Sequence, residues 1–195
     1  MFMRFITATC ITLLISCSAS AKDIVEYFPD HLFNDYPDQN NFVADWYSKQ
    51  LLAMHEQPLF PPQSNIQVYR FTWLRTFHNP MSFRLVINSG GSASLFVKRA
   101  NGAGGYDPGQ LDLDTSVKIS AARAKLLLEI LDKMKFWSMP KSERREMTDG
   151  AEWILEGVSN SLYHLVSRNS PEGGLYRDFG LELINQSGVN VGDIY

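Results

Sequence analysis

The chain has 195 residues, of which 45% are hydrophobic, 12% aromatic and 20% charged. This length and composition favour one globular domain with a core of its own. A formal net charge of −3 gives no sign of the basic face that nucleic-acid binding usually needs, so we expect no nucleic-acid partner.

The first 21 residues have the layout of an export signal. Arg4 precedes an uncharged, mostly apolar run from Phe5 to Ser16, and Ala19-Ser20-Ala21 is an A-x-A cleavage site. The apolar run is too short to span a bilayer. We therefore expect residues 1–21 to be a signal peptide and the protein to be exported to the periplasm.

A second interpretation makes the protein a lipoprotein. Leu14-Ile15-Ser16-Cys17 resembles a bacterial lipobox, in which the cysteine is lipidated and becomes the new N-terminus. The signal would then be residues 1–16, and Ser18 is typical of lipoproteins sent to the outer membrane. Several acyl chains on Cys17 would anchor stably, since each buried methylene contributes about 0.8 kcal/mol. The sequence leaves both interpretations open.

Cysteines add nothing structural to the mature chain. Cys10 and Cys17 both belong to the signal region, so no disulfide, thiol nucleophile or cysteine metal ligand is expected beyond it.

Residues 22–39 alternate between polar and aromatic side chains, which indicates a tether or irregular arm. A single domain over 40–195 follows. Aromatic residues of the arm could dock it on the domain: Tyr27, Phe28, Phe33 and Tyr36.

The domain opens with a helix and a strong strand. Apolar side chains recur at helical spacing from Asn40 to Met54, and prolines from Pro58 onward end the pattern. This pattern is typical of an amphipathic helix packed on a sheet. A helix that forms a partner-binding groove would show the same apolar pattern. Ile66–Thr76 is β-branched and aromatic on both faces, which predicts a central strand.

Residues 82–88 and 93–100 are predicted to pair around Gly90-Gly91, since two glycines suit a two-residue turn. This register puts Phe96 on the face of Phe83, and Arg84 with Arg99 on the other face. That second face is either solvated rim or a surface for an anion or a partner.

The glycine-rich stretch 101–109, NGAGGYDPG, is predicted to be a long surface loop that can cover a cleft. It lacks the Gly-Lys-Ser/Thr sequence and the following helix of a phosphate-binding loop, so no nucleotide cofactor is expected. Leu111–Ile119 alternates apolar residues as a further strand does. Ser120 can then cap a helix over 121–135.

Residues 149–171 are predicted to form a second hairpin. With Ser159-Asn160 as its turn, Trp153 and His164 share one face. Glu152, Glu156 and Tyr163 share the other, which we expect to be an exposed partner surface. A one-residue slip would exchange the faces. Ser170-Pro171 has the chemistry of a helix start, leading into a last helix near 174–187.

The best catalytic constellation lies in this hairpin: Glu156, Tyr163, His164 and Arg168. The predicted register puts His164 and Glu156 on opposite faces, which argues against joint action. In the competing interpretation His164 is a hydrogen-bonded core residue and Arg168 braces the loop before the last helix. The histidines lack metal-site spacing and no G-x-S-x-G elbow occurs, so we expect no metal and no cofactor.

Several long motifs resemble a family of uncharacterised secreted or lipid-anchored bacterial proteins. They are WYSKQLLAMHEQPLF, YRFTWLRTFHNPMSFRL, NGAGGYDPG, FWSMP and DGAEWILEGVSNSLYHLVSRNSP. The resemblance covers most of the mature domain. Members tend to have Arg-Trp-Ser-Pro where this chain has Arg168 to Pro171. The family brings no known activity, so it implies no catalytic residue.

The predicted fold is α+β. An antiparallel sheet of five to six strands is built from two hairpins and a central strand, with about three helices packed mainly on one face.

Three functions compete: a non-catalytic envelope binding or interaction module with an unknown envelope partner, a small periplasmic hydrolase using Glu156, Tyr163 and His164, and an accessory lipoprotein of an envelope complex. The first is preferred. The candidate partner surface comprises Arg84, Arg99, Glu152, Glu156 and Tyr163.

Overall fold

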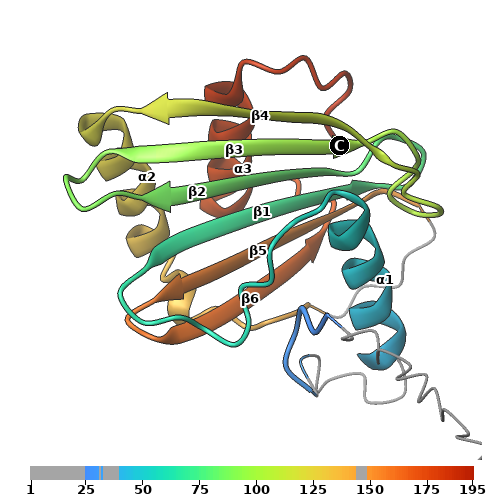
Figure 1. The fold of residues 1–195 in the computed structure, drawn as a ribbon, viewed down its shortest axis with the longest axis horizontal. Coiled ribbons are helices and arrows are strands. Elements are labelled where there is room, and N and C mark those ends of the chain that lie inside the picture. Colours follow the sequence, from blue (N-terminus) through green and yellow to red (C-terminus); the bar gives the residue numbers. More distant parts are fainter. Residues whose placement is uncertain (1–24, 31, 33–39, 144–148) are drawn as a thin grey trace, which may run out of the picture.

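The computed structural model describes residues 25–30, 32, 40–143 and 149–195 (Figure 1). In chain order the elements are α1 (Asn40–Ala53), β1 (Gln67–Arg75), β2 (Met81–Ile87), β3 (Ala93–Ala100), β4 (Leu111–Ile119), α2 (Ala121–Lys133), the 3-10 turn η1 (Phe136–Ser138), β5 (Ala151–Ser159), β6 (Leu162–Asn169) and α3 (Leu175–Ser187). The predicted α+β class is confirmed. In this part of the chain, no helix combines the length and apolar character needed to cross a membrane.

The six strands form one antiparallel sheet in the order β4-β3-β2-β1-β5-β6. The predicted central strand, β1, pairs with β2 on one side and β5 on the other. Both its faces are buried because helices lie on both sides of the sheet. Tyr69, Phe71 and Trp73 point toward the layer formed by α2 and α3.

Two helices, α2 and α3, cover the face that lies behind the sheet in Figure 1. Leu127 of α2 and Phe179 of α3 are fully buried there. At Gly180 an added Cβ would lie 2.7 Å from the Trp153 ring. The absence of a side chain lets α3 pack directly on that tryptophan, and this layer is the main core.

The third helix, α1, lies on the opposite face, in front of the sheet in Figure 1. Tyr47, Leu51 and Met54 pack there against β5 and β6. The described part of the arm joins this layer, because Tyr27 and Phe28 are buried and the Phe28 ring lies 6.1 Å from that of Tyr47. Phe33 and Tyr36 lie outside the described residues.

The predicted register of the β2–β3 hairpin is wrong by one residue. Leu85 lies opposite Leu95, and Arg84 lies opposite Phe96. The turn is longer than Gly90-Gly91, because the Asn88 amide donates to the Ser92 carbonyl at 2.8 Å. This register buries Leu95 and Val97 in the core, which outweighs the preference of the glycine pair for a two-residue turn. Arg84 and Arg99 consequently lie on different faces.

The β5–β6 turn lies one residue later than predicted, at Asn160-Ser161. Their φ angles of 51° and 61° are those of a type I′ turn. Glu156 now opposes Leu165 and His164 opposes Gly157, yet the predicted faces are kept.

The predicted helix start at Ser170-Pro171 is wrong. The Ser170 hydroxyl accepts a hydrogen bond from the Ala151 amide at 2.9 Å and so tethers β5 instead of capping a helix. Helix α3 begins at Leu175, close to the expected position of the last helix.

Candidate functional site

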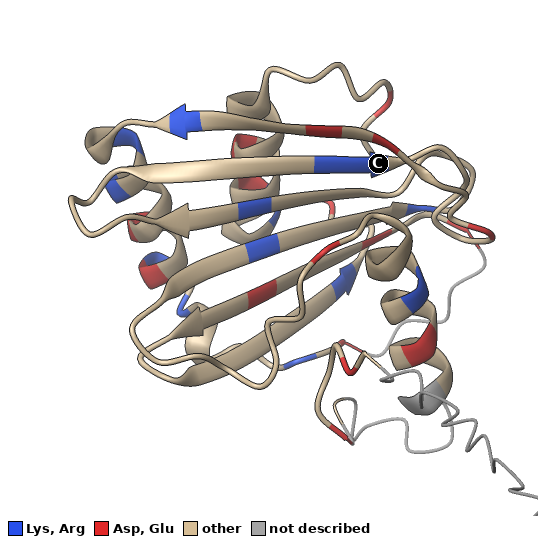
Figure 2. Ribbon diagram, viewed as in Figure 1, with Lys and Arg blue, Asp and Glu red and all other residues tan. Residues whose placement is uncertain are grey.

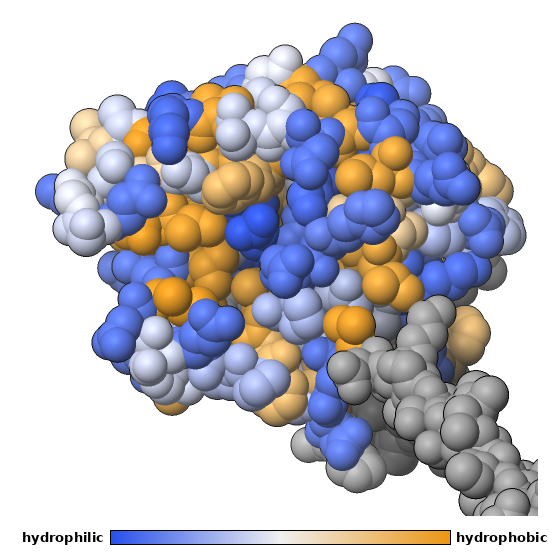
Figure 3. Space-filling model, in the orientation of Figure 1, coloured by the Kyte–Doolittle hydropathy of each residue, from blue (hydrophilic) through white to orange (hydrophobic). Residues whose placement is uncertain are grey.

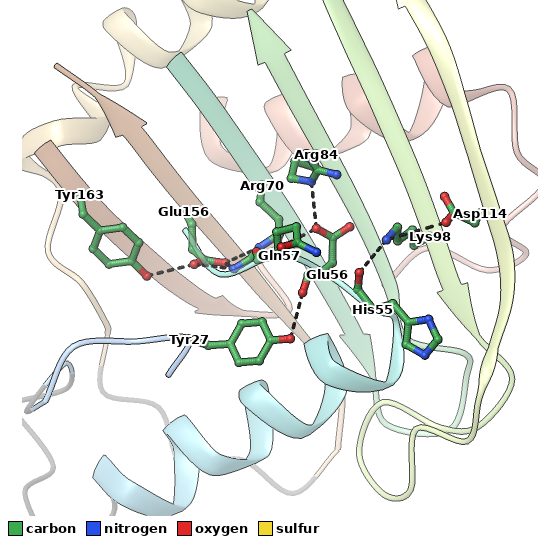
Figure 4. Close-up of polar contacts among 10 residues, drawn as sticks. All are labelled: Tyr27, His55, Glu56, Gln57, Arg70, Arg84, Lys98, Asp114, Glu156 and Tyr163. Carbon is green, nitrogen blue, oxygen red and sulfur yellow. Dashed lines mark hydrogen bonds and ion pairs between the residues drawn. The ribbon is translucent and has the colours of Figure 1, made fainter. Parts of the chain in front are cut away.

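Three sequence-predicted site residues meet in a buried polar cluster on the α1 face (Figure 4). The Arg70 guanidinium donates two hydrogen bonds to the Glu156 carboxylate, at 2.7 and 2.8 Å. The Tyr163 hydroxyl donates to the same carboxylate at 3.0 Å. Arg84 donates from Nε to Glu56 Oε2 at 2.9 Å, and that oxygen lies 3.7 Å from Arg70 Nη1.

The cluster fixes the segment that follows α1 onto the sheet. Arg70 Nη1 donates to the Gln57 carbonyl at 2.6 Å, and Lys98 Nζ donates to the His55 carbonyl at 2.7 Å. From the arm, the Tyr27 hydroxyl donates to the Glu56 carbonyl at 2.9 Å. Backbone carbonyls of the segment after α1 therefore find partners on the sheet and on the arm.

Neither charge of the central pair reaches solvent, since Arg70 and Glu156 are both 0% exposed. Burial raises the pKa of the Glu156 carboxyl, and the neighbouring Arg70 opposes that rise. A substrate could reach this carboxylate only by displacing the segment after α1. The arrangement supports a structural brace and not a catalytic group.

The predicted partner face of Glu152, Glu156 and Tyr163 is not exposed, and this corrects the expectation from sequence. Helix α1 and the arm cover it. Glu152 is buried and accepts a hydrogen bond from the Ser167 hydroxyl, which also contacts the Tyr47 hydroxyl at 2.9 Å. Burial raises the pKa of Glu152 as well.

Arg99 does not join Arg84. It forms a partly exposed ion pair with Asp112 at the end of β3, with both hydrogen bonds at 3.0 Å. The predicted two-arginine surface is therefore absent from the described part of the sheet. Figure 2 shows basic and acidic residues interleaved along the strands and helices.

His164 lies on the other face of the sheet from Glu156. Its Nε2 is 3.1 Å from the Met139 carbonyl, and its ring centroid is 5.1 Å from that of Phe136. Burial lowers the pKa of the imidazole. The structure thus separates the two groups that a hydrolase would need to combine.

Arg168 braces the chain before α3. It donates to the carbonyls of Ser167 and Pro140, and its Nε lies 2.9 Å from a Glu143 carboxylate oxygen. A hollow of about 470 Å³ lies beside it at the start of α3. Because its arginine is already engaged, this hollow is a weaker candidate for a binding site. Cys17 lies outside the described residues.

A second hollow, of about 510 Å³, lies between α1 and the loop 101–110, and we call it the aromatic groove. Its lining comes from α1, the residue after β1, the loop and the segment before β5: Phe42, Asp45, Trp46, Lys49, Thr76, Gly105, Tyr106 and Asp149. Four of the five resemblance motifs, those that begin at Trp46, Tyr69, Asn101 and Asp149, each contribute residues to this lining, although they are far apart in sequence.

Glycines let the loop lie directly against the end of β1. A Cβ on Gly104 would lie 2.8 Å from the Arg75 backbone, and one on Gly105 would lie 2.9 Å from Thr76 Cα. The Gly104 amide donates to the His78 carbonyl at 2.9 Å. The expected surface loop is thus a fixed wall of a groove, held by the backbone that follows β1.

Helix α1 is attached to this wall by its polar side chains. Trp46 Nε1 donates to the Gly104 carbonyl at 2.8 Å, and Gln50 Nε2 donates to the same oxygen at 3.1 Å. Lys49 forms an exposed ion pair with Asp107 at 3.1 Å. These contacts hold both walls of the groove in place before any ligand arrives.

Large aromatic side chains remain exposed around the groove. Phe42 is 72% exposed, Tyr106 is 62% exposed, and the neighbouring Phe77 is 63% exposed. The rings of Phe77 and Tyr106 lie 6.1 Å apart. Hydrophobic residues interrupt the hydrophilic surface on the α1 side of the molecule, as Figure 3 shows. Gathered apolar exposure of this kind marks interaction sites.

The sequence missed this site because its signals looked structural. Phe42 belongs to the apolar pattern of residues 40–54, which is typical of the buried side of a helix, and Tyr106 is one aromatic residue in a glycine-rich loop. Among the described residues, no group of three or more histidine, cysteine, aspartate or glutamate side chains could hold a metal ion.

No known protein family matches the chain, and no curated protein shows significant sequence similarity to it. The family resemblance therefore stays a prediction, and the geometry of the groove is the basis for a proposed function.

Proposed function

We propose that this protein is an exported, envelope-associated binding module without catalytic activity, and that the aromatic groove is its recognition surface. One observation carries the proposal: Phe42, Phe77 and Tyr106 are exposed together around a hollow of about 510 Å³. Binding pockets are largely pre-formed and lined by aromatic side chains with a few polar groups. The groove has this composition, and its walls are fixed by hydrogen bonds.

Export is part of the same proposal and is supported by the N-terminal sequence. Either signal peptidase cuts after Ala21, or Cys17 is lipidated and anchors the protein to the outer membrane. Mass spectrometry of the mature N-terminus, on protein purified from whole cells, distinguishes these two forms. An unmodified chain beginning at Lys22 excludes the anchor, while a diacylglyceryl group on Cys17 establishes it.

The hydrolase alternative receives no comparable support. Its acid, Glu156, is enclosed with Arg70, and its base, His164, faces the other layer of the fold. General acid–base catalysis requires both groups within hydrogen-bond reach of one substrate. We therefore propose recognition, not hydrolysis, for this chain.

Site-specific photo-cross-linking in intact cells tests the groove. A cross-linking amino acid replaces Tyr106 in the full chain, and a matched variant carries it at Leu126, an exposed position on α2 far from the groove in Figure 1. We expect a discrete adduct from position 106 and none from position 126. Identical adduct patterns from the two positions, or no adduct from position 106, would refute the groove as the recognition surface.

A further inference from the structure

We propose that the aromatic groove takes a cationic side chain, a lysine ammonium or arginine guanidinium, presented by a peptide segment of a partner protein. This inference rests on the proposed function of the groove. It adds the chemistry of the ligand, which follows from the charges and rings that line the hollow.

The lining carries more negative than positive charge. Asp45 and Asp149 are both exposed, and within the described ranges neither forms an ion pair. The one lysine of the lining, Lys49, is already paired with Asp107 at 3.1 Å. The Gly109 amide and Lys49 together lower the pKa of Asp107, so this carboxylate stays ionised and holds the lysine.

Two carboxylates of the lining therefore remain that have no ion-pair partner among the described residues. Asp45 projects from α1, and Asp149 precedes β5. A ligand carrying a positive charge would neutralise them, whereas an anionic ligand would find no free cation among the described lining residues. Complementary charge of this kind selects partners and raises the rate of association.

The aromatic lining favours the same kind of ligand. Cations are attracted to the faces of tryptophan, tyrosine and phenylalanine, and aromatic cages recognise ammonium groups in this way. Trp46 already donates its indole N–H to Gly104, so its ring, and not its donor, is left for a ligand. Phe42 and Tyr106 add exposed rings beside it.

The aliphatic stem of a lysine or arginine suits this combination. Such side chains bury their methylenes on apolar surface and keep the charged head among polar groups. The aromatic rings would contact the stem, and Asp45 and Asp149 would face the head. A neutral sugar could also stack on the rings, but it would leave both carboxylates without a counter-charge.

The test uses the full mature chain and follows the Trp46 indole N–H by NMR during titration. The probe is the peptide acetyl-Gly-Lys-Gly-Lys-Gly-amide. Its matched control is the same peptide with both lysines acetylated, which keeps the stem and removes the charge. We expect the charged peptide to bind at least fivefold more tightly, with the advantage decreasing as salt rises.

Variants identify the groups responsible. The double variant Asp45→Asn/Asp149→Asn should remove the preference for the charged peptide. Asp132→Asn, at an exposed position on α2, should leave it unchanged. Both sets of substitutions are isosteric and exposed, and a circular dichroism melt of each variant checks that it remains folded.

The outcomes separate the inference from the proposed function. Equal binding of both peptides, or tighter binding of the neutral disaccharide diacetylchitobiose, would show that the groove does not recognise a positive charge. The groove would then still stand as a binding site. Binding of n-butylammonium as tight as that of the peptide would overturn the protein partner. If no probe shifts the Trp46 signal and position 106 gives no adduct in cells, the proposed function fails too.

Discussion

Two regions beside α1 handle polarity in opposite ways. The Arg70–Glu156 cluster buries charged side chains away from water, and the aromatic groove exposes large aromatic rings to water. Burying charges and exposing apolar rings both cost free energy in the isolated protein. They differ in whether the protein itself supplies the partner groups.

In the cluster, the charges are paired inside the fold. Each oxygen of Glu156 has a donor, and Arg70 also reaches the Gln57 carbonyl. In the groove, hydrogen bonds hold the two walls together. The rings stay exposed, and Asp45 and Asp149 have no ion-pair partner among the described residues. A region completed by its own chain stabilises the fold, while a region that lacks a partner is suited to recognise one.

The largest expected effect comes from breaking the cluster. Arg70→Met leaves the Glu156 carboxylate buried without its cation, and should lower the free energy of unfolding by about 3–5 kcal/mol. Urea denaturation measures the loss. Arg99→Met, which removes a partly exposed ion pair, should cost at most about 1 kcal/mol. The double variant Arg70→Met/Glu156→Leu should recover much of the stability. Equal losses for Arg70→Met and Arg99→Met would contradict the structural role of the cluster.

The next effect concerns the wall of the groove. Gly104→Ala places a Cβ within 2.8 Å of the Arg75 backbone, and should lower stability by about 1–3 kcal/mol while displacing the loop. Gly90→Ala is the control, because no heavy atom lies within 4 Å of its added Cβ. Thermal melts compare the two. A Gly104→Ala variant as stable as the wild type would show that the loop is not held as described.

A smaller change in stability, but a clear one in binding, is expected inside the groove. Tyr106→Ala removes an exposed ring, so the free energy of unfolding should change by less than about 0.5 kcal/mol. Binding of the lysine peptide should weaken about tenfold or more, as for an aromatic hot spot. Leu162→Ala, exposed on the β5–β6 hairpin, should leave binding of the peptide unchanged. Equal losses of binding in both variants would show that the peptide does not bind in the groove.

The smallest effect is in the pH dependence of stability. Burial raises the folded-state pKa of Glu152, so the folded protein holds this proton to higher pH than the unfolded chain does. The contribution of Glu152 is fully present below its unfolded pKa and is lost as pH rises through the folded value. Glu152→Gln should therefore flatten the stability profile between about pH 4 and neutrality. Glu172→Gln, an exposed control, should leave the profile as it is.

Periodicity and turn chemistry were enough to predict most of the elements. The apolar pattern of Ile66–Thr76 on both faces correctly predicted the central strand, and Ser120 caps α2 as expected, accepting from the Arg123 amide at 3.3 Å. The faces of the β5–β6 hairpin were also right. Local sequence reports these features because burial and capping act over a few residues.

Only the tertiary structure decided which faces were covered and what met at the groove. The sequence placed Glu152 and Glu156 on one face but could not show that α1 and Tyr27 would enclose it. It favoured a two-residue turn at Gly90-Gly91, which the burial of Leu95 overrode. The groove joins Phe42, Tyr106 and Asp149, and no local pattern links residues so far apart. A sequence determines which residues can be buried or exposed, whereas the packing of distant segments determines which of them share a site.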